Sequence, residues 1–260
     1  MRVSLIQTAI AWAEPEVNLQ KYLGLLSALK GKSDLAVLPE MCLSGFGAPA
    51  PAISESNQGK HISRLRQAAA DYGLAVAGSF SACDEKTGRY YNRGFFFNPD
   101  GKSYYYDKKH LFSIGEETNY YSAGNKQLNF NYLGWNIRLI VCYDLRFPLW
   151  CRNRQNEYDL LLVVANWPQA RKKAWKTLLQ ARALENLAYV CGVNRVGEDG
   201  PGIVYCGDSV LLDYKANALS TIEAGREQTE TVSLDLEALR DFRQKFPAWK
   251  DADAFQFSEE

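Results

Sequence analysis

The feature that most constrains the fold is the apolar run Leu139-Ile140-Val141-Cys142, which is followed at once by the polar segment from Asp144 to Pro148. Such a run fits a strand buried on both faces, and the segment after it cannot continue the strand. Cys142 is therefore predicted at the carboxyl end of a strand, where open α/β sheets gather their active sites. Because a free cysteine is more often a small buried hydrophobe, the thiol alone does not establish catalysis.

Two further strands are predicted to end in charged residues. The apolar run Leu35–Leu38 leads into Pro39 and Glu40, and the alternating segment Tyr104–Tyr106 leads to Lys108. A glutamate, a lysine and a cysteine form a sufficient set for thiol acyl transfer, since they supply a base, a cation for the oxyanion and a nucleophile. A charged group at one strand end is more often solvated than catalytic. The prediction of a catalytic site therefore rests on the three residues occurring together.

The chain has only two histidines, His61 and His110. A cysteine peptidase of the Cys/His kind needs an imidazole to activate its thiol. His61 stands at the start of a predicted helix among polar neighbours and is interpreted as a solvated surface residue. His110 is interpreted as a hydrogen-bonding support near Lys108, so the sequence disfavours a Cys/His dyad.

Composition points to a protein that acts on small molecules. Thirty basic residues against thirty acidic ones leave no net field to attract a nucleic acid. No segment reaches the roughly 18 apolar residues that span a bilayer, and Met1-Arg2 leads directly into a strand-like run, so we expect a cytoplasmic protein without membrane contact. The six cysteines show no paired metal-ligand spacing and do not suit a disulfide framework in a chain of this length, and Cys42 is interpreted as an incidental thiol.

Strand and helix patterns alternate along the chain without a linker, which predicts one α/β domain over residues 1–260. Strands are expected at 2–8, 34–39, 74–80, 90–98, 102–107, 135–141, 159–165 and 188–194. Helices are expected at 16–30, 61–72, 147–156 and 171–187, and a second hairpin near 208–221. The βαβ units imply parallel neighbours, and the Asn98–Gly101 turn implies an antiparallel pair, so mixed sheets are predicted.

Three motifs together resemble the nitrilase (carbon–nitrogen hydrolase) superfamily in order and spacing. They are Leu38-Pro39-Glu40-Met41, Lys108-Lys109-His110-Leu111-Phe112 and Cys142-Tyr143-Asp144-Leu145-Arg146-Phe147-Pro148. The resemblance runs over essentially the whole chain. Within the superfamily the chain is most similar to the ω-amidases, particularly the bacterial group linked to methionine salvage, with Ala165–Pro168 and Phe246–Trp249 as further markers.

The resemblance implies a fold and a set of roles. The fold is a four-layer αββα sandwich, with mixed sheets flanked by helices. Glu40 matches the general base, Lys108 the lysine that stabilises the tetrahedral intermediate, and Cys142 the nucleophile. Glu117 fits a second glutamate, although the adjacent Glu116 leaves that assignment open. The backbone amide of Tyr143 would be the second oxyanion donor, as amides beside a nucleophile usually are.

Residues for substrate binding are expected in the loops around this site. Arg146 is a candidate fork for a substrate carboxylate, with a structural ion pair as the alternative. Asn166 would bind an oxo or carboxylate group or else cap a loop. Aromatic residues in these loops would form an apolar wall around a short acyl chain: Phe46, Tyr120, Phe147 and Trp167. The resemblance also implies a homodimer, with residues 147–156 and 171–187 as the expected interface.

The resulting hypothesis is an ω-amidase that hydrolyses the terminal amide of 2-oxoglutaramate or 2-oxosuccinamate through a cysteine thioester, with no metal and no organic cofactor required. Another carbon–nitrogen hydrolase, acting on N-carbamoyl amino acids or on deaminated glutathione, is the first alternative. A noncatalytic binding or scaffold protein that retains the fold is the second.

Overall fold

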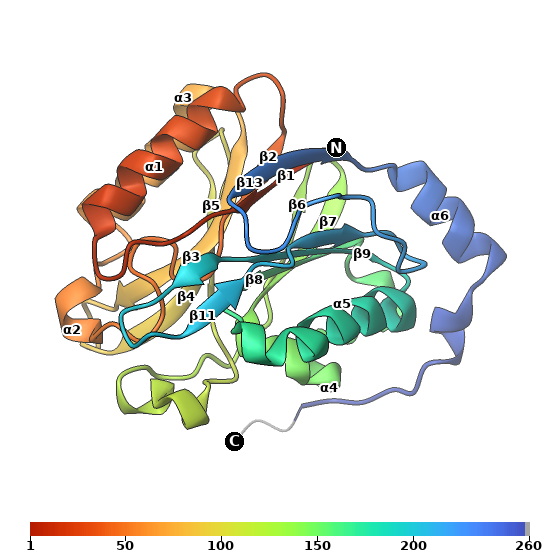
Figure 1. Cartoon of the computed structure of the whole chain (residues 1–260). Helices are drawn as coiled ribbons and strands as arrows, with labels where there is room; N and C mark the ends of the chain where they lie inside the picture. The colour runs from red at the N-terminus through yellow and green to blue at the C-terminus, as the bar shows by residue number, and fades with distance from the viewer. Residues whose placement is uncertain (258–260) are drawn as a thin grey trace.

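Two sheets stack face to face, and helices cover the outer face of each in the computed structural model, which describes residues 1–257 (Figure 1). The first sheet has the strand order β13-β1-β2-β3-β4-β5, with β1 (Arg2–Gln7), β2 (Leu35–Val37), β3 (Ala75–Cys83), β4 (Tyr90–Phe97), β5 (Ser103–Asp107) and β13 (Gln228–Ser233). The second has the order β12-β9-β8-β7-β6, with β6 (Asn129–Tyr132), β7 (Trp135–Val141), β8 (Leu160–Ala165), β9 (Tyr189–Asn194) and β12 (Val210–Leu212).

Helices α1 (Pro15–Ala28) and α3 (Lys60–Tyr72) lie on the first sheet, while α4 (Pro148–Cys151) and α5 (Lys172–Asn186) lie on the second (Figure 1). The remaining elements are α2 (Ala50–Ile53), α6 (Leu236–Lys245), the small hairpin β10 (Val196–Glu198) and β11 (Val204–Cys206), and the short 3₁₀ helices η1 (Ser113–Gly115), η2 (Glu117–Asn119), η3 (Cys142–Arg146), η4 (Arg154–Asn156), η5 (Gln169–Arg171) and η6 (Ala248–Asp251). Helix, sheet, sheet and helix therefore form the expected αββα order.

Strand alternation in the first sheet explains why both of its faces are covered. Val3 and Leu5 point into the core between the sheets, whereas Ile6 packs outward with residues of α1 and α3. The same division holds in β4, where Phe96 faces the second sheet and Phe95 faces the helices. Because successive side chains of a strand point to opposite faces, an apolar run of this kind needs a partner layer on each side.

The two sheets approach closely at Gly94 in β4. A Cβ atom at this position would lie 3.0 Å from a side-chain methyl of Leu139 in β7, which is tighter than ordinary packing allows. The missing side chain therefore lets β4 and β7 meet, and β7 leads directly to Cys142.

Most of the expected elements are confirmed to within a few residues, including the parallel pairing of β1, β2 and β3 and the antiparallel hairpin of β4 and β5. The helix expected at 147–156 is wrong in extent. It stops at Cys151, and a separate 3₁₀ turn follows over Arg154–Asn156. The physical reason is Asn153, whose side chain donates to the carbonyls of Tyr158 and Asn186 and so holds the backbone out of a helix.

The C-terminal half also departs from expectation. The hairpin expected near 208–221 is present in reduced form: β12 pairs with β9, and the returning segment meets β12 through an antiparallel bridge between Leu212 and Ala218 and a hydrogen bond from the N–H of Leu219 to the carbonyl of Leu211. Strands β6, β13 and the hairpin of β10 and β11 were not expected from the sequence. After α6 the chain runs back along the second sheet's helices (Figure 1). The ring centres of Phe257 and Trp150 lie 5.2 Å apart.

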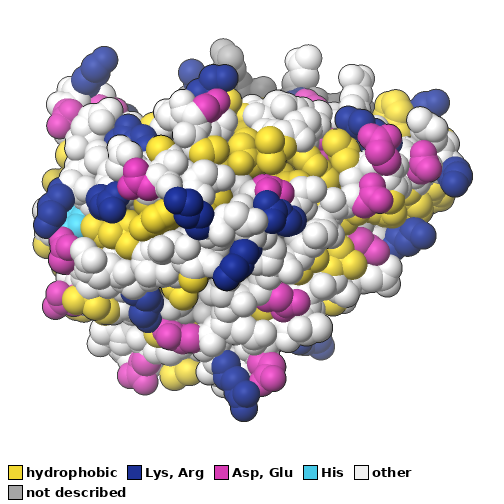
Figure 2. All heavy atoms as spheres, turned by 90° about the horizontal axis from the view of Figure 1, so that it is seen from above, with side chains coloured by type: hydrophobic (Ala, Val, Ile, Leu, Met, Phe, Trp, Pro, Cys, Tyr) yellow, Lys and Arg dark blue, Asp and Glu magenta, His cyan; other side chains and the backbone are white. Residues whose placement is uncertain are grey.

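Basic and acidic side chains are intermingled on the face shown in Figure 2, with apolar side chains between them. This face therefore carries no extended field of one sign, in keeping with the balanced charge of the chain. Within residues 1–257, none of the helices combines the length and apolar character that a membrane crossing requires.

Candidate active site

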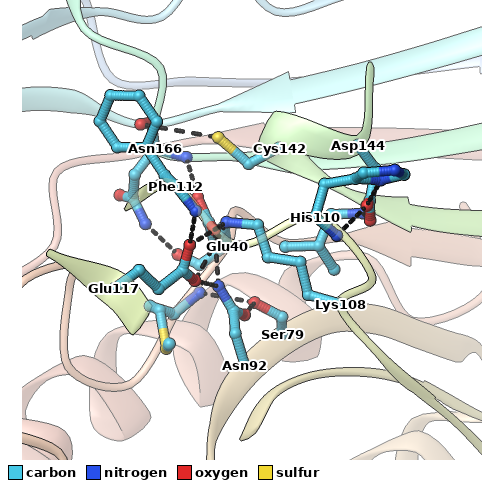
Figure 3. A network of polar contacts seen from close by, with 12 residues as sticks. Glu40, Ser79, Asn92, Lys108, His110, Phe112, Glu117, Cys142, Asp144 and Asn166 are labelled. Carbon is cyan, nitrogen blue, oxygen red and sulfur yellow. Dashed lines mark hydrogen bonds and ion pairs between the residues drawn. The ribbon is translucent and has the colours of Figure 1, made fainter. Parts of the chain in front are cut away.

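Three strand ends bring a carboxylate, an ammonium group and a thiol to one place (Figure 3). Glu40 lies shortly after β2, Lys108 directly follows β5, and Cys142 directly follows β7. The Nζ atom of Lys108 lies 3.0 Å from Oε1 of Glu40 and 2.9 Å from Oε2 of Glu117. The side chains of Lys108, Glu40 and Glu117 are all buried, so the ammonium group is shared between two carboxylates without solvent screening.

Glu40 also joins the two sheets. Its Oε2 accepts a 2.7 Å hydrogen bond from the backbone N–H of Asn166, which follows β8, and its carbonyl accepts one of 2.7 Å from the side-chain nitrogen of Asn166. The thiol of Cys142 contacts the carbonyl oxygen of the same asparagine at 3.9 Å. The base candidate of the first sheet is thereby held beside the nucleophile candidate of the second.

Asn92 completes the polar cluster and was missed in the sequence. Its side-chain nitrogen donates to Oε1 of Glu40 at 2.7 Å and to Oε1 of Glu117 at 2.9 Å, while its oxygen accepts from Ser79 at 3.0 Å (Figure 3). The signal that could have revealed it is an amide residue within β4, a strand that also carries three buried phenylalanines, Phe95 to Phe97. A fully buried amide in such a strand needs partners of its own.

The structure separates the two adjacent glutamates. Glu117 is buried against Lys108, and its Oε2 accepts a 2.6 Å hydrogen bond from the backbone N–H of Phe112. Glu116 is exposed and has left-handed backbone angles between the two 3₁₀ turns. Of the pair, only Glu117 reaches the lysine in the described structure.

The turn that presents Cys142 is strained and firmly held. Cys142 has a φ of 45°, a left-handed conformation that residues with a Cβ adopt at a cost. The carboxylate of Asp144 accepts hydrogen bonds from the N–H of Val141, from the N–H and the Nδ1 of His110 and from the hydroxyl of Tyr106. Asp144 thus ties the turn to the loop that carries Lys108, and His110 acts as the support that the sequence indicated.

We expect Asp144→Asn to lower the stability by about 2 to 3 kcal/mol, because an amide satisfies fewer of these four donors than a carboxylate does. A shift of the thiol relative to Lys108 should also lower kcat by about 10- to 100-fold. Urea unfolding and steady-state kinetics measure the two effects. Asp241→Asn, an exposed position on α6, is the matched control and should leave both quantities unchanged. Native values in Asp144→Asn would contradict the proposed positioning role.

Burial raises the pKa of the Cys142 thiol well above its ordinary value. The negative charge of Glu40 raises this pKa further, while the positive charge of Lys108 opposes the shift. The resting sulfur is therefore a neutral thiol near neutral pH, and it needs a proton acceptor at the moment of attack.

This pKa can be tested by the ultraviolet absorbance of the thiolate, measured as the difference between the native protein and Cys142→Ala. The difference is expected to develop only at alkaline pH. In Glu40→Gln, compared with Glu40→Gln carrying Cys142→Ala, it should develop at a lower pH, because the charge that raises the pKa is gone. A thiolate already present at neutral pH in the native protein would contradict this account.

A cavity of about 220 Å³ opens onto this cluster. Its wall includes Lys108, Cys142, Arg146, Asn166, Phe46 and Trp167. This volume lies below the roughly 300 to 1,000 Å³ typical of drug-sized ligands, which favours a small metabolite. The six residues named here are all among those proposed from the sequence.

Arg146 lines the cavity and has no acidic partner in the described part of the chain. Its guanidinium lies 4.9 Å from the centre of the Trp167 ring, and it forms no ion pair within the described part of the chain. The alternative role of Arg146, a structural ion pair, would need an acidic partner, and none is present among residues 1–257. Phe46 lies under the ammonium of Lys108, with 5.5 Å between Nζ and the ring centre.

Asn166 lines the cavity and is partly bonded within the protein. Its side-chain nitrogen donates one hydrogen bond, to the carbonyl of Glu40, and its Oδ1 is buried without a hydrogen-bond partner in the described structure. Because an amide NH₂ carries two donor hydrogens, binding of an oxo or carboxylate group by Asn166 stays a prediction beside this contact with the loop of Glu40.

Several expected wall residues lie elsewhere. Tyr120 is 49% exposed and does not line the cavity, and the ring of Phe147 stacks on His110 with 3.7 Å between ring centres. Cys42 is buried away from the cavity. His61 is only partly exposed, and its Nε2 lies 3.4 Å from a carboxylate oxygen of Glu16. It does not line the cavity.

Comparison with known proteins agrees with this geometry. A family model described as Carbon-nitrogen hydrolase matches residues 2–244. The chain is 41% identical to the omega-amidase YafV of Escherichia coli K12 over 256 residues, which cover 98% of each chain. It is 30% identical to the 2-oxoglutaramate amidase of Bacillus subtilis 168, covering 96% of each chain.

A solved structure shares both fold and sequence with this chain. It is that of XC1258 from Xanthomonas campestris, described as a CN-hydrolase superfamily protein with an arsenic adduct in the active site. The two chains are 43% identical, with a TM-score of 0.95 over 99% of each.

Proposed function

This chain belongs to the carbon–nitrogen hydrolase family and is an ω-amidase by its full-length likeness to the E. coli enzyme, and we propose that it hydrolyses 2-oxoglutaramate and 2-oxosuccinamate. These compounds are terminal amides of 2-oxo dicarboxylic acids, and the products are the oxo acid and ammonia. The observation that carries the proposal is the buried cluster of Glu40, Lys108 and Glu117 beside Cys142, at a cavity whose wall includes Arg146, a cation with no ion-pair partner among residues 1–257.

In the first half of the proposed reaction, Glu40 accepts the thiol proton while the sulfur of Cys142 forms a bond to the amide carbon. The π electrons of the carbonyl move to oxygen, and the resulting oxyanion is stabilised by Lys108 and the backbone N–H of Tyr143. When the tetrahedral intermediate collapses, the carbon–nitrogen bond breaks. Glu40 returns its proton to the leaving nitrogen, so ammonia departs and a thioester remains.

The second half repeats the chemistry with water. Glu40 takes a proton from a water molecule, whose oxygen attacks the thioester carbon. Collapse of this second intermediate breaks the carbon–sulfur bond, returns the proton to sulfur and releases the dicarboxylic oxo acid. Atoms and protons balance over the cycle without a redox or metal step.

The charge on Lys108 is supported by its surroundings. Burial alone would lower the pKa of this ammonium group, but the carboxylates of Glu117 and Glu40 outweigh burial and raise the pKa above its ordinary value. Lys108 therefore stays protonated throughout the working range and acts as a fixed positive charge. In this proposal Glu117 orients the lysine and Glu40 transfers protons.

The proposal is tested by measuring ammonia release from 2-oxoglutaramate and 2-oxosuccinamate beside glutamine, asparagine, N-carbamoyl-β-alanine and deaminated glutathione. We expect kcat/KM to be highest for the two oxo-acid amides. Preference for the carbamoyl compound or for deaminated glutathione would overturn the substrate assignment in favour of another carbon–nitrogen hydrolase. No turnover of any amide, together with alkylation of Cys142 no faster than that of the other cysteines, would favour a noncatalytic protein.

We further propose that the protein is a cytoplasmic homodimer that uses the surfaces of α4 and α5. The support is an exposed leucine on each helix, Leu149 at 58% and Leu184 at 53%. Isolated apolar side chains of this size are common on surfaces, so the pair is tested directly. Leu184→Lys is expected to shift the sedimentation coefficient toward that of a monomer at low protein concentration, whereas the exposed control Leu133→Lys should not.

A further inference from the structure

We infer that Arg171 is a second anion-binding residue of the same cavity, and that it and Arg146 together hold the 2-oxo carboxylate end of the substrate. The inference deepens the proposed function and rests on it. Arg171 ends η5, directly before α5, and it lines the cavity together with Cys142 and Arg146. No motif in the sequence singles it out.

The guanidinium of Arg171 has no ion pair and no side-chain hydrogen bond to any residue from 1 to 257. This differs from the common pattern in this chain, where arginines such as Arg93 and Arg243 pair with Asp107 and Asp159. Two guanidinium groups without an ion pair among residues 1–257, those of Arg146 and Arg171, thus line one cavity of about 220 Å³. Arg171 is exposed and Arg146 is half-buried, so solvent screens part of their mutual repulsion, and an anion that occupies the cavity relieves the rest.

Each guanidinium lies over an aromatic ring. Arg146 lies over Trp167, and Arg171 lies 5.1 Å from the centre of the Phe112 ring. Contact between a guanidinium and an aromatic face restricts the side chain while leaving the N–H groups at the guanidinium edge free. The two arginines are therefore oriented in advance for bidentate hydrogen bonds to a carboxylate.

Trp167 links the two arginines. Its ring supports Arg146, and its Nε1–H donates a 3.0 Å hydrogen bond to the carbonyl oxygen of Arg171. Its own backbone is fixed by Asn194, which accepts from the N–H of Trp167 and donates to its carbonyl. One buried residue thus sets the position of both cations relative to the cavity.

The acidic residues of the cavity wall leave these cations available. Both side-chain oxygens of Asp199 are occupied, one by the N–H of Ile203 and the other by the hydroxyl of Tyr205, each at 2.8 Å. Glu116 is exposed at the cavity wall and makes no ion pair with either arginine in the described structure.

The chemistry of a 2-oxo acid fits two guanidinium groups. Its carboxylate and oxo oxygens are three adjacent acceptors with no donor, and guanidinium groups are donors only. An α-amino acid amide would place an ammonium group where the oxo oxygen lies. Two nearby cations disfavour that group, which gives a physical reason for preferring 2-oxoglutaramate over glutamine.

The test compares Arg171→Met with the matched control Lys173→Met on two substrates. Methionine keeps an apolar side chain near Phe112 and removes the charge, while Lys173 is an exposed cation of α5 that does not line the cavity. The substrates are 2-oxoglutaramate and pentanamide, a neutral amide of the same chain length. In Arg171→Met we expect kcat/KM for 2-oxoglutaramate to fall about 10- to 100-fold, mainly through KM.

The neutral amide should be hydrolysed by Arg171→Met at close to the native rate, and Lys173→Met should match the native protein on both substrates. The double variant Arg146→Met/Arg171→Met should lose less than the product of the single losses, because both arginines bind one group. An equal loss on both substrates would assign Arg171 a structural role only. No loss on either would leave it a solvated surface cation, and both outcomes overturn the inference.

Binding of the product separates this inference from the proposed function. Calorimetry with 2-oxoglutarate requires no turnover, and the affinity is expected to fall in Arg171→Met but not in Lys173→Met. Should the native protein fail to hydrolyse 2-oxoglutaramate yet bind 2-oxoglutarate through Arg171, the substrate assignment fails and the anion site stands. Absence of 2-oxoglutarate binding to the native protein overturns the anion site.

Discussion

Cys142→Ala is expected to lower kcat for 2-oxoglutaramate by about 10⁴-fold or more, because the proposed nucleophile is removed and the thioester cannot form. Positioning by Lys108 and the arginines remains, so substrate should still bind with nearly native affinity. Ammonia release gives the rate, and calorimetry gives the affinity. The effect falls on kcat because the lost interaction exists only along the reaction path.

The matched control is Cys83→Ala, which removes a half-buried thiol at the end of β3. This variant should retain native kcat and KM. Cys142→Ser adds a second comparison, since it keeps a hydroxyl at the same place but one that Glu40 deprotonates far less readily. Substantial turnover by Cys142→Ala would contradict covalent catalysis by this residue, even if the fold and substrate assignments were right.

Lys108→Met is expected to lower kcat by about 10³-fold or more and to lower the free energy of unfolding by about 3 to 5 kcal/mol. The ammonium group is the shared partner of Glu40 and Glu117, and all three side chains are buried. Without it, two carboxylates are left close together in a medium of low dielectric constant. One of them should then take up a proton, which means that its pKa rises in the folded variant.

The pH dependence of this variant has a definite sign. A carboxyl whose pKa is higher in the folded than in the unfolded state stabilises the fold below the unfolded pKa, and this contribution is lost as pH rises through the folded pKa. Lys108→Met should therefore be more stable at mildly acidic pH than at mildly alkaline pH in urea unfolding. Lys109→Met, at the neighbouring lysine, is the control and should not show this trend. A Lys108→Met protein of native stability at alkaline pH would contradict the shared ion pair.

The charged residues of the site were predictable because each follows a recognisable strand. Apolar runs and their abrupt ends located Glu40, Lys108 and Cys142, and strands of this type present their ends at a common edge. Glu40 and Lys108 meet at 3.0 Å at one edge of the first sheet, but the position of Cys142 beside them depends on how two sheets stack, and a local pattern carries no such information. The resemblance to a family supplied the stacking.

The parts that were missed are those specified by distant partners. Asn92 is a buried amide in a mostly aromatic strand, and its role depends on two glutamates far away in the sequence. The end of the helix at Cys151 depends on Asn153 and its bonds to Tyr158 and Asn186. Arg171 was missed because its distinguishing feature is the absence of an acidic partner among residues 1–257, and a sequence does not show which charges pair.

The division of the site between the sheets has a consequence for how activity appears during refolding. Glu40, Asn92 and Lys108 belong to the first sheet, while Cys142 and Asn166 belong to the second. Neither sheet on its own carries both the base Glu40 and the nucleophile Cys142. The rate at which ammonia release recovers therefore measures the docking of one sheet on the other. We expect this recovery to lag behind the return of secondary structure measured by circular dichroism.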